Sequence, residues 1–230
     1  MSLNIAIIPA RNGSKSIPNK NLQKLGTKTL VERAIVSAKN SGAFSDIILS
    51  TDIPTLIEDY RRSNVVSLVE RPSSLACDES LMADVVLHAI DKCEIGSDDR
   101  IWILQPTSPF RVRRDYHNIL EMFESKETRS VISVFNVGAN HPNRMYTVHR
   151  DQLFPLSKTK FVNKQALPNI FQRSGHFYVF YARDFLKYKN FYIKPCRPYM
   201  IDKLQAINID EPIDLRMAQL LFESGICPTV

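Results

Sequence analysis

The sequence has little glycine and no long apolar run. Seven of its 230 residues are glycines, and neither the three-glycine dinucleotide fingerprint nor the Walker phosphate loop occurs. No apolar run approaches the roughly 20 residues of a membrane-spanning helix. The N-terminus leads directly into an expected strand, without a secretory leader. We therefore expect a cytoplasmic protein with no membrane partner.

Cysteine motifs and nucleic-acid motifs are also absent. The four cysteines are Cys77, Cys93, Cys196 and Cys227. They are too far apart in sequence for a zinc knuckle or a redox dithiol, so we expect reduced thiols. The formal net charge of +6 suits either a nucleic acid or an anionic small molecule. Because the basic residues are scattered, we expect a phosphate-bearing substrate and no nucleic-acid partner.

Short apolar runs alternate with helical periodicity along most of the chain, which is typical of parallel βαβ units. Hydrophobic residues make up 44%, enough for a core, and the length suits one α/β domain with an elaboration. The expected strands cover 4–8, 46–50, 65–69, 101–104, 130–135, 176–181 and the extended segment 195–201. The expected helices cover 29–41, 54–62, 80–92, 113–125, 183–188 and 211–224.

The alternation stops between residues 137 and 175, which are rich in Asn, Pro, Lys and isolated aromatics. A structureless insert of this length is uncommon inside a compact domain. We expect irregular strands or a hairpin that projects from the sheet and contacts another subunit. The predicted division is an α/β domain of residues 1–136 and 176–230, with a dimerisation insert at 137–175.

The first expected strand runs into a cationic loop. The loop carries three cations and two small residues, Arg11, Lys15, Lys20, Gly13 and Ser14. A buried strand leading into such a loop presents backbone N–H groups and positive charge to phosphates. Ligands of open α/β sheets bind at the carboxyl ends of strands. We therefore predict a phosphate site here, and the alternative is a solvated connecting loop.

Two polar segments follow the second and third expected strands. Ser50-Thr51-Asp52 is typical of a helix N-cap. The segment 71–80 offers a cation at Arg71 and ends directly before an expected helix. Asp78 or Ser80 is suited to cap that helix. Arg71 has no such structural explanation, which favours a binding role.

Two more segments carry groups suited to polar ligands. Gln105 offers an amide donor and acceptor in a loop stiffened by two prolines. Asn208 and Asp210 lie on the same side of an extended segment. A carboxylate with an oxygen neighbour holds Mg²⁺ when a triphosphate supplies the remaining ligands.

Together these segments resemble the CMP-N-acetylneuraminate synthetase family, cytidylyltransferases that activate nine-carbon 2-keto sugar acids. The resemblance covers nearly the whole chain. Its motifs are, in order, Ile8-Pro-Ala-Arg-Asn-Gly-Ser-Lys15, Lys20-Asn21, Ser50-Thr-Asp52, Arg71-Pro72 with Leu75-Ala76 and Asp78, Leu104-Gln-Pro-Thr-Ser-Pro109 with Arg111, and Asn208-Ile-Asp210 with Asp214.

The resemblance implies a Rossmann-like nucleotidyltransferase fold, with a mostly parallel sheet flanked by helices and a protruding dimerisation segment. It implies a homodimer that converts CTP and an acidic nine-carbon sugar into a CMP-sugar and pyrophosphate, with Mg²⁺ as cofactor. The implied catalytic residues are Arg11, Lys15, Lys164 and Asp210. The implied substrate-binding residues are Gly13, Ser14, Lys20, Asn21, Arg71, Ser80, Gln105 and Arg173, and the implied metal ligands are Asp210 and Asn208.

Three positions depart from the family pattern, all on the sugar and metal side. Asn208 stands where the family usually has Asp, and Lys164 stands in an arginine position, where it keeps the charge but loses the bidentate fork. Arg173 is expected to take over carboxylate binding. The alternatives are a CMP-legionaminate, CMP-pseudaminate or CMP-KDO synthetase, or a catalytically weakened sugar-nucleotide-binding paralogue. The intact Gln105-Pro-Thr-Ser108 loop favours sialate- or legionaminate-like acceptors. We expect the histidines to be structural or exposed, and His176 is the one to inspect for a substrate contact.

Overall fold

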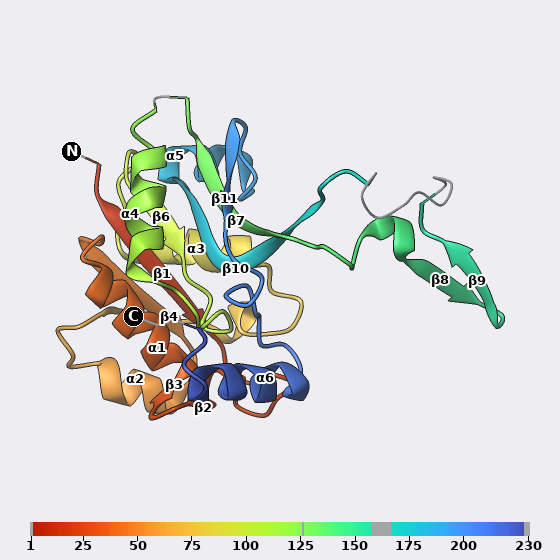
Figure 1. Ribbon diagram of the computed structural model, residues 1–230. Coiled ribbons are helices and arrows are strands. Elements are labelled where there is room, and N and C mark those ends of the chain that lie inside the picture. The colour runs from red at the N-terminus through yellow and green to blue at the C-terminus, as the bar shows by residue number, and fades with distance from the viewer. Residues whose placement is uncertain (1, 126, 158–166, 228–230) are drawn as a thin grey trace.

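The computed structural model describes residues 2–125, 127–157 and 167–227. Its centre is a seven-stranded sheet with helices on both faces (Figure 1). From one edge to the other the strands are β11 (Cys196–Met200), β7 (Ser130–Asn136), β10 (Phe171–Tyr181), β6 (Arg100–Ile103), β1 (Asn4–Ala10), β4 (Asp46–Thr51) and β5 (Ser67–Glu70). All run in one direction except β10, which is antiparallel to both neighbours. The sheet is therefore mixed and mostly parallel, as expected.

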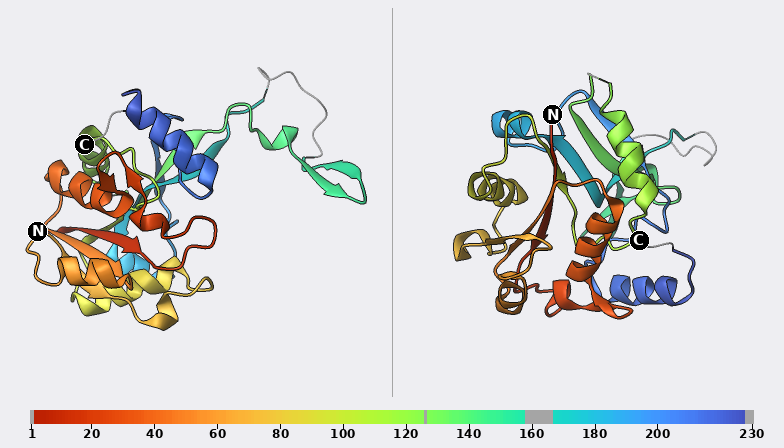
Figure 2. Two further views of the ribbon diagram at one scale, coloured as in Figure 1. Left: turned by 90° about the horizontal axis from the view of Figure 1, so that it is seen from below. Right: turned by 90° about the vertical axis from the view of Figure 1, so that its left-hand side faces the viewer.

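A layer of helices covers each face of the sheet (Figure 2), and alternating apolar side chains of the strands pack against both layers. Helices α1 (Leu30–Ser41), α2 (Pro54–Tyr60) and α4 (Arg113–Met122) pack on the face that includes Ala6 and Ile8 of β1. Helices α3 (Met82–Lys92) and α5 (Ala182–Tyr188) pack on the face that includes Ile5 and Ile7. This arrangement follows from the two-residue period of a strand, which points successive side chains to opposite faces.

A third, smaller core lies beneath the cationic loop. Helix α6 (Pro212–Glu223) packs there against the two-stranded ribbon of β2 (Lys24–Leu25) and β3 (Lys28–Thr29). Its buried members include Ile17 of the loop and Ile209, directly before α6. This core joins the two ends of the chain that carry the predicted phosphate and metal residues. No helix among the described residues is long and apolar enough to cross a membrane.

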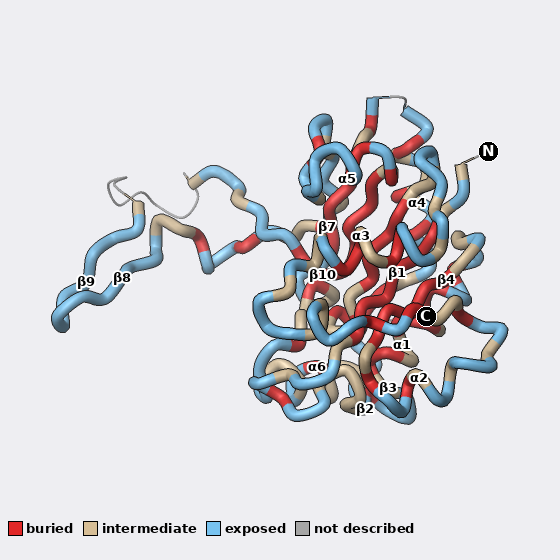
Figure 3. The backbone as a smooth tube through the Cα atoms, turned by 180° about the vertical axis from the view of Figure 1, so that it is seen from behind, coloured by how far each residue is buried: buried red, intermediate tan, exposed pale blue. Residues whose placement is uncertain are grey.

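A hairpin projects far from the sheet. Strands β8 (Tyr146–His149) and β9 (Gln152–Pro155) pair antiparallel after a short 3-10 turn, η3 (Pro142–Arg144). Figures 1 and 3 show this arm extending away from the body of the molecule, with its residues exposed on all sides. The expected projecting hairpin is therefore present.

The expected helices and strands are present with shifted ends, and one shift is large. Strand β10 begins at Phe171, whereas the sequence predicts it from residue 176. Residues Phe171–Arg173 pair with Val134–Asn136 of β7, and the register then shifts before Tyr178. Ser174 and Gly175 interrupt the apolar alternation that identifies a strand, so the predicted start of this strand is wrong. The sheet begins five residues earlier than the pattern indicates.

Candidate active site

A polar cleft of about 840 Å³ opens where the loops after β1, β5 and β6 meet. Ten of the predicted site residues line it: Arg11, Ser14, Lys15, Lys20, Asn21, Arg71, Gln105, Arg173, Asn208 and Asp210. The loops after β1 and β5 form the wall on the β1 side, and the loop after β6, together with β7 and β10, forms the opposite wall. Parallel strands end at one edge of a sheet, which explains why residues so far apart in sequence meet here.

Two of the predicted site residues lie away from the cleft lining, and the structure does not describe a third. Among the described residues, Gly13 and Ser80 do not line the cleft. The Ser80 hydroxyl instead contacts the Ser74 carbonyl at 3.1 Å and the Cys77 Sγ at 3.0 Å. Lys164 lies outside the described residues. Ser80 and Asp78 do not cap α3 either, because its N-cap is Leu81 and no side chain caps it.

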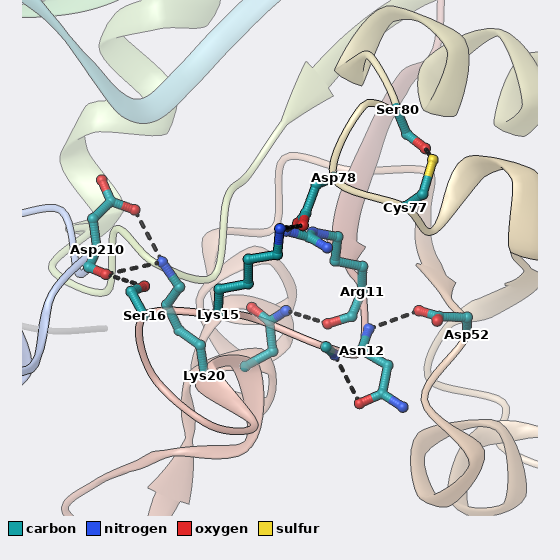
Figure 4. Close-up of polar contacts among 12 residues, drawn as sticks. Arg11, Asn12, Lys15, Ser16, Lys20, Asp52, Cys77, Asp78, Ser80 and Asp210 are labelled. Atoms are coloured by element: carbon teal, nitrogen blue, oxygen red, sulfur yellow. Dashed lines mark hydrogen bonds and ion pairs between the residues drawn. The ribbon is translucent and has the colours of Figure 1, made fainter.

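Two cations of the loop after β1 converge on one carboxylate (Figure 4). Arg11 Nη2 lies 2.6 Å from Asp78 Oδ1, and Lys15 Nζ lies 2.6 Å from Asp78 Oδ2. These hydrogen bonds and charges lower the pKa of Asp78, so the carboxylate is ionised at neutral pH. The cationic loop is therefore tied directly to the loop before α3.

Backbone contacts fix the shape of the cationic loop. The Asn21 side chain donates to the Arg11 carbonyl at 2.9 Å, and the Asn12 N–H donates to Asp52 at 2.8 Å. Gly13 has φ of +71°, a conformation that side chains rarely adopt. Asn21 and Asp52 therefore support the loop, and Gly13 permits its turn, while Ser14, Lys15 and Ser16 face the cleft.

Asp210 is held from both sides at the far end of the cationic loop. Lys20 Nζ lies 3.0 Å from Asp210 Oδ1, and the Asn208 amide nitrogen donates to Asp210 Oδ2. Ser16 donates to the Asp210 carbonyl. The Asn208 carbonyl oxygen in turn accepts from Ser108 at 3.2 Å. The predicted metal residues are therefore adjacent, and their polar atoms form one network.

Asp210 and Asn208 fit a magnesium ion that takes most of its ligands from the nucleotide phosphates and water. Among the described residues, no group of three or more His, Cys, Asp and Glu side chains is gathered around one point. The Asp210 side chain is 63% exposed toward the cleft, and Asn208 adds a neutral oxygen. Mg²⁺ commonly takes one or two carboxylates together with substrate phosphates and water. One carboxylate beside a cationic loop matches that pattern.

Gln105 packs unusually closely against β10. A Cβ atom at Gly175 would lie 2.3 Å from Gln105 Oε1 and 2.6 Å from Ser108 Oγ, so a side chain at position 175 would displace the ends of both side chains. The buried Arg111 completes the junction, because its guanidinium donates to the carbonyls of Gln105 at 2.7 Å and His176 at 3.0 Å. Gln105 is thus positioned by β10 and by Arg111.

Arg71 is largely enclosed in the cleft wall. Its guanidinium donates to the Ser50 carbonyl at 2.9 Å. Burial lowers the pKa of Arg71 to about 10, so the side chain remains charged at neutral pH. It therefore brings a fixed positive charge to the cleft and also ties β5 to β4.

His176 is structural and does not reach the cleft. Its side chain is fully buried, beside the backbone of Phe110 and Gln205. Burial, with the nearby Arg111 charge, lowers the pKa of His176 well below 6.5. His176 is therefore structural, one of the two expected roles for the histidines, and its ring lies in the core.

Several cleft residues were missed by sequence reasoning. They come from the loops after β1 and β6, the start of α3, and strands β7 and β10, and include Ser16, Met82, Thr107, Phe135, Gln172, Ser174 and Tyr178. Phe135 and Gln172 are direct partners in the β7–β10 ladder. Only knowledge of that antiparallel pairing would have brought them together.

Comparison with known proteins identifies the family. A cytidylyltransferase family model matches residues 5–224. The chain belongs to the cytidylyltransferase family. The expected family and the expected nucleotidyltransferase class are thereby confirmed.

Two curated cytidylyltransferase relatives are similar over nearly all of this chain. The CMP-N,N'-diacetyllegionaminic acid synthase of Legionella pneumophila is 29% identical over 95% of this chain and 96% of that protein. The N-acylneuraminate cytidylyltransferase of Escherichia coli O18:K1:H7 is 29% identical over 93% of this chain, which spans about half, 51%, of that protein. A solved CMP:2-keto-3-deoxy-manno-octonic acid synthetase in complex with CTP superposes with a TM-score of 0.71 over 97% of this chain and 100% of that one, at 15% identity. At that identity the likeness shows the fold alone.

Proposed function

We propose that this protein transfers CMP from CTP to the anomeric hydroxyl of a nonulosonic 2-keto sugar acid and releases pyrophosphate. One observation carries the proposal: a single cleft joins the cationic loop of Arg11 and Lys15 to an opposite wall that carries Gln105 and Arg173. The first wall suits a triphosphate, and the second suits a polyhydroxylated carboxylic acid. The relatives named for legionaminic and acylneuraminic acids support the same substrate class.

The residues divide the work of an in-line displacement at the α-phosphorus. Such chemistry depends mainly on positioning and on neutralising the negative charge that spreads over the phosphates. Arg11, Lys15 and Lys20 supply positive charge along the triphosphate, and Arg71 supplies it near the ribose and base. Gln105 and Arg173 hold the sugar acid so that its hydroxyl meets the α-phosphate.

Asp210, with Asn208 as a neutral oxygen neighbour, would hold the magnesium ion. The ion supplies charge neutralisation at the phosphate oxygens when it is bound. Lys20 orients Asp210 through the 3.0 Å ion pair. Ser108 orients the Asn208 side chain by donating a hydrogen bond to its amide oxygen.

Incubation with CTP, Mg²⁺ and a panel of 2-keto sugar acids tests the proposal through pyrophosphate release. The panel contains N-acetylneuraminate, a legionaminate, a pseudaminate and KDO. We expect release with one of the two first acids, because the Gln105-to-Ser108 loop is intact. A preference for KDO or pseudaminate would change the proposed acceptor and leave the proposed reaction unchanged.

A weakened nucleotide-binding paralogue is the second candidate, and one observation favours it. The Asn208 side chain donates to Asp210 instead of adding a second carboxylate. This candidate predicts measurable CTP binding with no pyrophosphate release from any acid. That result would overturn the enzymatic proposal.

We also propose that the β8–β9 arm forms the contact of a homodimer. The arm exposes Val148 by 71%, Leu153 by 66% and Leu156 by 59%. Apolar side chains gathered on a projecting segment commonly mark a protein–protein contact. An arm directed away from its own body is suited to reach a second copy of the chain.

A further inference from the structure

The cleft carries its own substitute for a phosphate. The Asp78 carboxylate places one oxygen 2.6 Å from Arg11 Nη2 and the other 2.6 Å from Lys15 Nζ. A bridging carboxylate with an oxygen on each of two cations has the charge and the spacing of a phosphate that binds the same pair. These are the cations to which the proposed function assigns the triphosphate. Asp78 and the nucleotide therefore require the same donors.

Asp78 belongs to a loop that can release it without disturbing the core. The loop closes on itself, because Ser80 donates to the Ser74 carbonyl at 3.1 Å and the Ala76 N–H donates to the Ser73 carbonyl at 3.1 Å. Arg11 and Lys15 are the polar partners that the described residues give to the Asp78 side chain. The Lys15 side chain is 84% exposed, so it can turn from the carboxylate toward a ligand.

We propose that Asp78 is an internal competitor of the nucleotide triphosphate, which exchanges with the phosphates on Arg11 and Lys15. The inference rests on the proposed binding of CTP at this loop. When phosphate oxygens bind the two cations, the adjacent carboxylate is repelled by the negative charge and moves out. When pyrophosphate is to leave, the returning carboxylate takes back both cations. Asp78 thus weakens the binding of substrate and product polyphosphate alike.

Calorimetric titration of Asp78→Asn with CTP, CMP and inorganic pyrophosphate tests this exchange. We expect CTP and pyrophosphate to bind roughly three- to tenfold more tightly than to the wild type, because two ion pairs of an exposed network no longer compete. CMP lacks the outer phosphates, so its affinity should change much less.

Glu79→Gln is the matched control. It removes the same charge from the neighbouring exposed residue of the same loop. Among the described residues, Glu79 forms no ion pair with Arg11 or Lys15. We expect it to tighten CTP binding less than twofold through the general change in charge. Equal tightening in both variants would overturn the exchange and leave only a long-range charge effect.

Other outcomes separate this inference from the proposed function. Weaker CTP binding in Asp78→Asn and in a second variant, Asp78→Ser, would make Asp78 a positioning residue and would overturn the competition. Unchanged binding in both variants would also overturn it. Failure of the wild-type protein to bind CTP would instead overturn the proposed function. Thermal melting of each variant confirms that the comparison is made on folded protein.

Discussion

Lys15 combines high exposure with a defined partner. Its side chain is 84% exposed, yet its Nζ lies 2.6 Å from Asp78. An exposed ion pair contributes little to folding, so the charge is free to serve a ligand. This separation of stability from function makes Lys15 suitable for substitution.

Lys15→Ala should lower kcat/KM by about 100-fold, because the triphosphate charge is left uncompensated as pyrophosphate departs. The melting temperature should stay nearly unchanged. Steady-state kinetics by pyrophosphate release measures the first, and calorimetry measures the second. Lys39→Ala, an exposed lysine of α1, is the control for loss of one positive charge. Near-normal turnover would refute the assigned role.

Asn208→Asp should lower the Mg²⁺ concentration that the enzyme requires and should lower the melting temperature of the metal-free protein. The new carboxylate would lie beside Asp210, which now accepts a hydrogen bond from Asn208. Without Mg²⁺ the like charges should lower the melting temperature by about 2–4 °C, equivalent to about 1 kcal/mol. With Mg²⁺ two carboxylates bind better than one, so the half-activating concentration should fall.

Asn190→Asp is the control for the change of Asn208, because Asn190 is exposed and its side-chain oxygen accepts from the Tyr192 N–H at 2.9 Å in the way an aspartate also does. An unchanged magnesium requirement in Asn208→Asp would show that position 208 is not a ligand.

At the scale of elements, β10 has a buried histidine that couples its packing to pH. The pKa of His176 is lowered well below 6.5 by burial and by Arg111. Below about pH 6.5, His176 is therefore protonated in the unfolded chain and neutral in the folded chain. Stability is complete above about pH 6.5 and falls as the pH drops toward the folded-state pKa.

The free energy of unfolding should decrease by up to about 1.4 kcal/mol per pH unit below pH 6.5 through this histidine. Urea unfolding at a series of pH values measures the slope. His176→Gln should flatten it, even where the variant is less stable throughout. His117→Gln, at an exposed position of α4, is the control. The same slope in wild type and His176→Gln would contradict the assignment.

The elements were predictable where one periodicity dominated. Val86, Ala89 and Ile90 form one face of α3, and the apolar run of β1 is buried on both sides. The beginning of β10 was not predictable, because its residues make contacts with distant segments. Gly175 lies against the Gln105 side chain, and the Ser174 hydroxyl hydrogen-bonds to that of Ser133. The local hydrophobic pattern indicates which residues are buried, but it does not show contacts with residues far away in the sequence.

The candidate site followed the same rule at the scale of the molecule. Residues on loops after parallel strands, such as Arg11, Arg71 and Gln105, were predictable because all such loops meet at one edge. Phe135, Gln172 and Tyr178 were not, because they reach the cleft through the antiparallel pairing of β7 and β10. Position in the sheet, which depends on distant segments, decides their role.

Val148→Asp should convert the proposed homodimer into a folded monomer. Val148 is 71% exposed and pairs with Leu153 across the arm, so a charge there would oppose burial against a second copy. Sedimentation velocity measures the oligomeric state. Leu186→Asp, on α5 of the body, is the control because Leu186 is also exposed, by 44%. A monomeric wild type would refute the dimer, and an unaltered dimer would refute the role of the arm.

Trp102 is the single tryptophan of the chain and is completely buried at the middle of the sheet. It pairs with Ala6 of β1 on one side and Val179 of β10 on the other. Beside the eight tyrosines, the protein therefore contains one tryptophan fluorophore, placed where the parallel strands meet the antiparallel one. Its emission follows the opening of the central sheet and is insensitive to the remote arm, so spectroscopy can separate global unfolding from events at the arm without an added label.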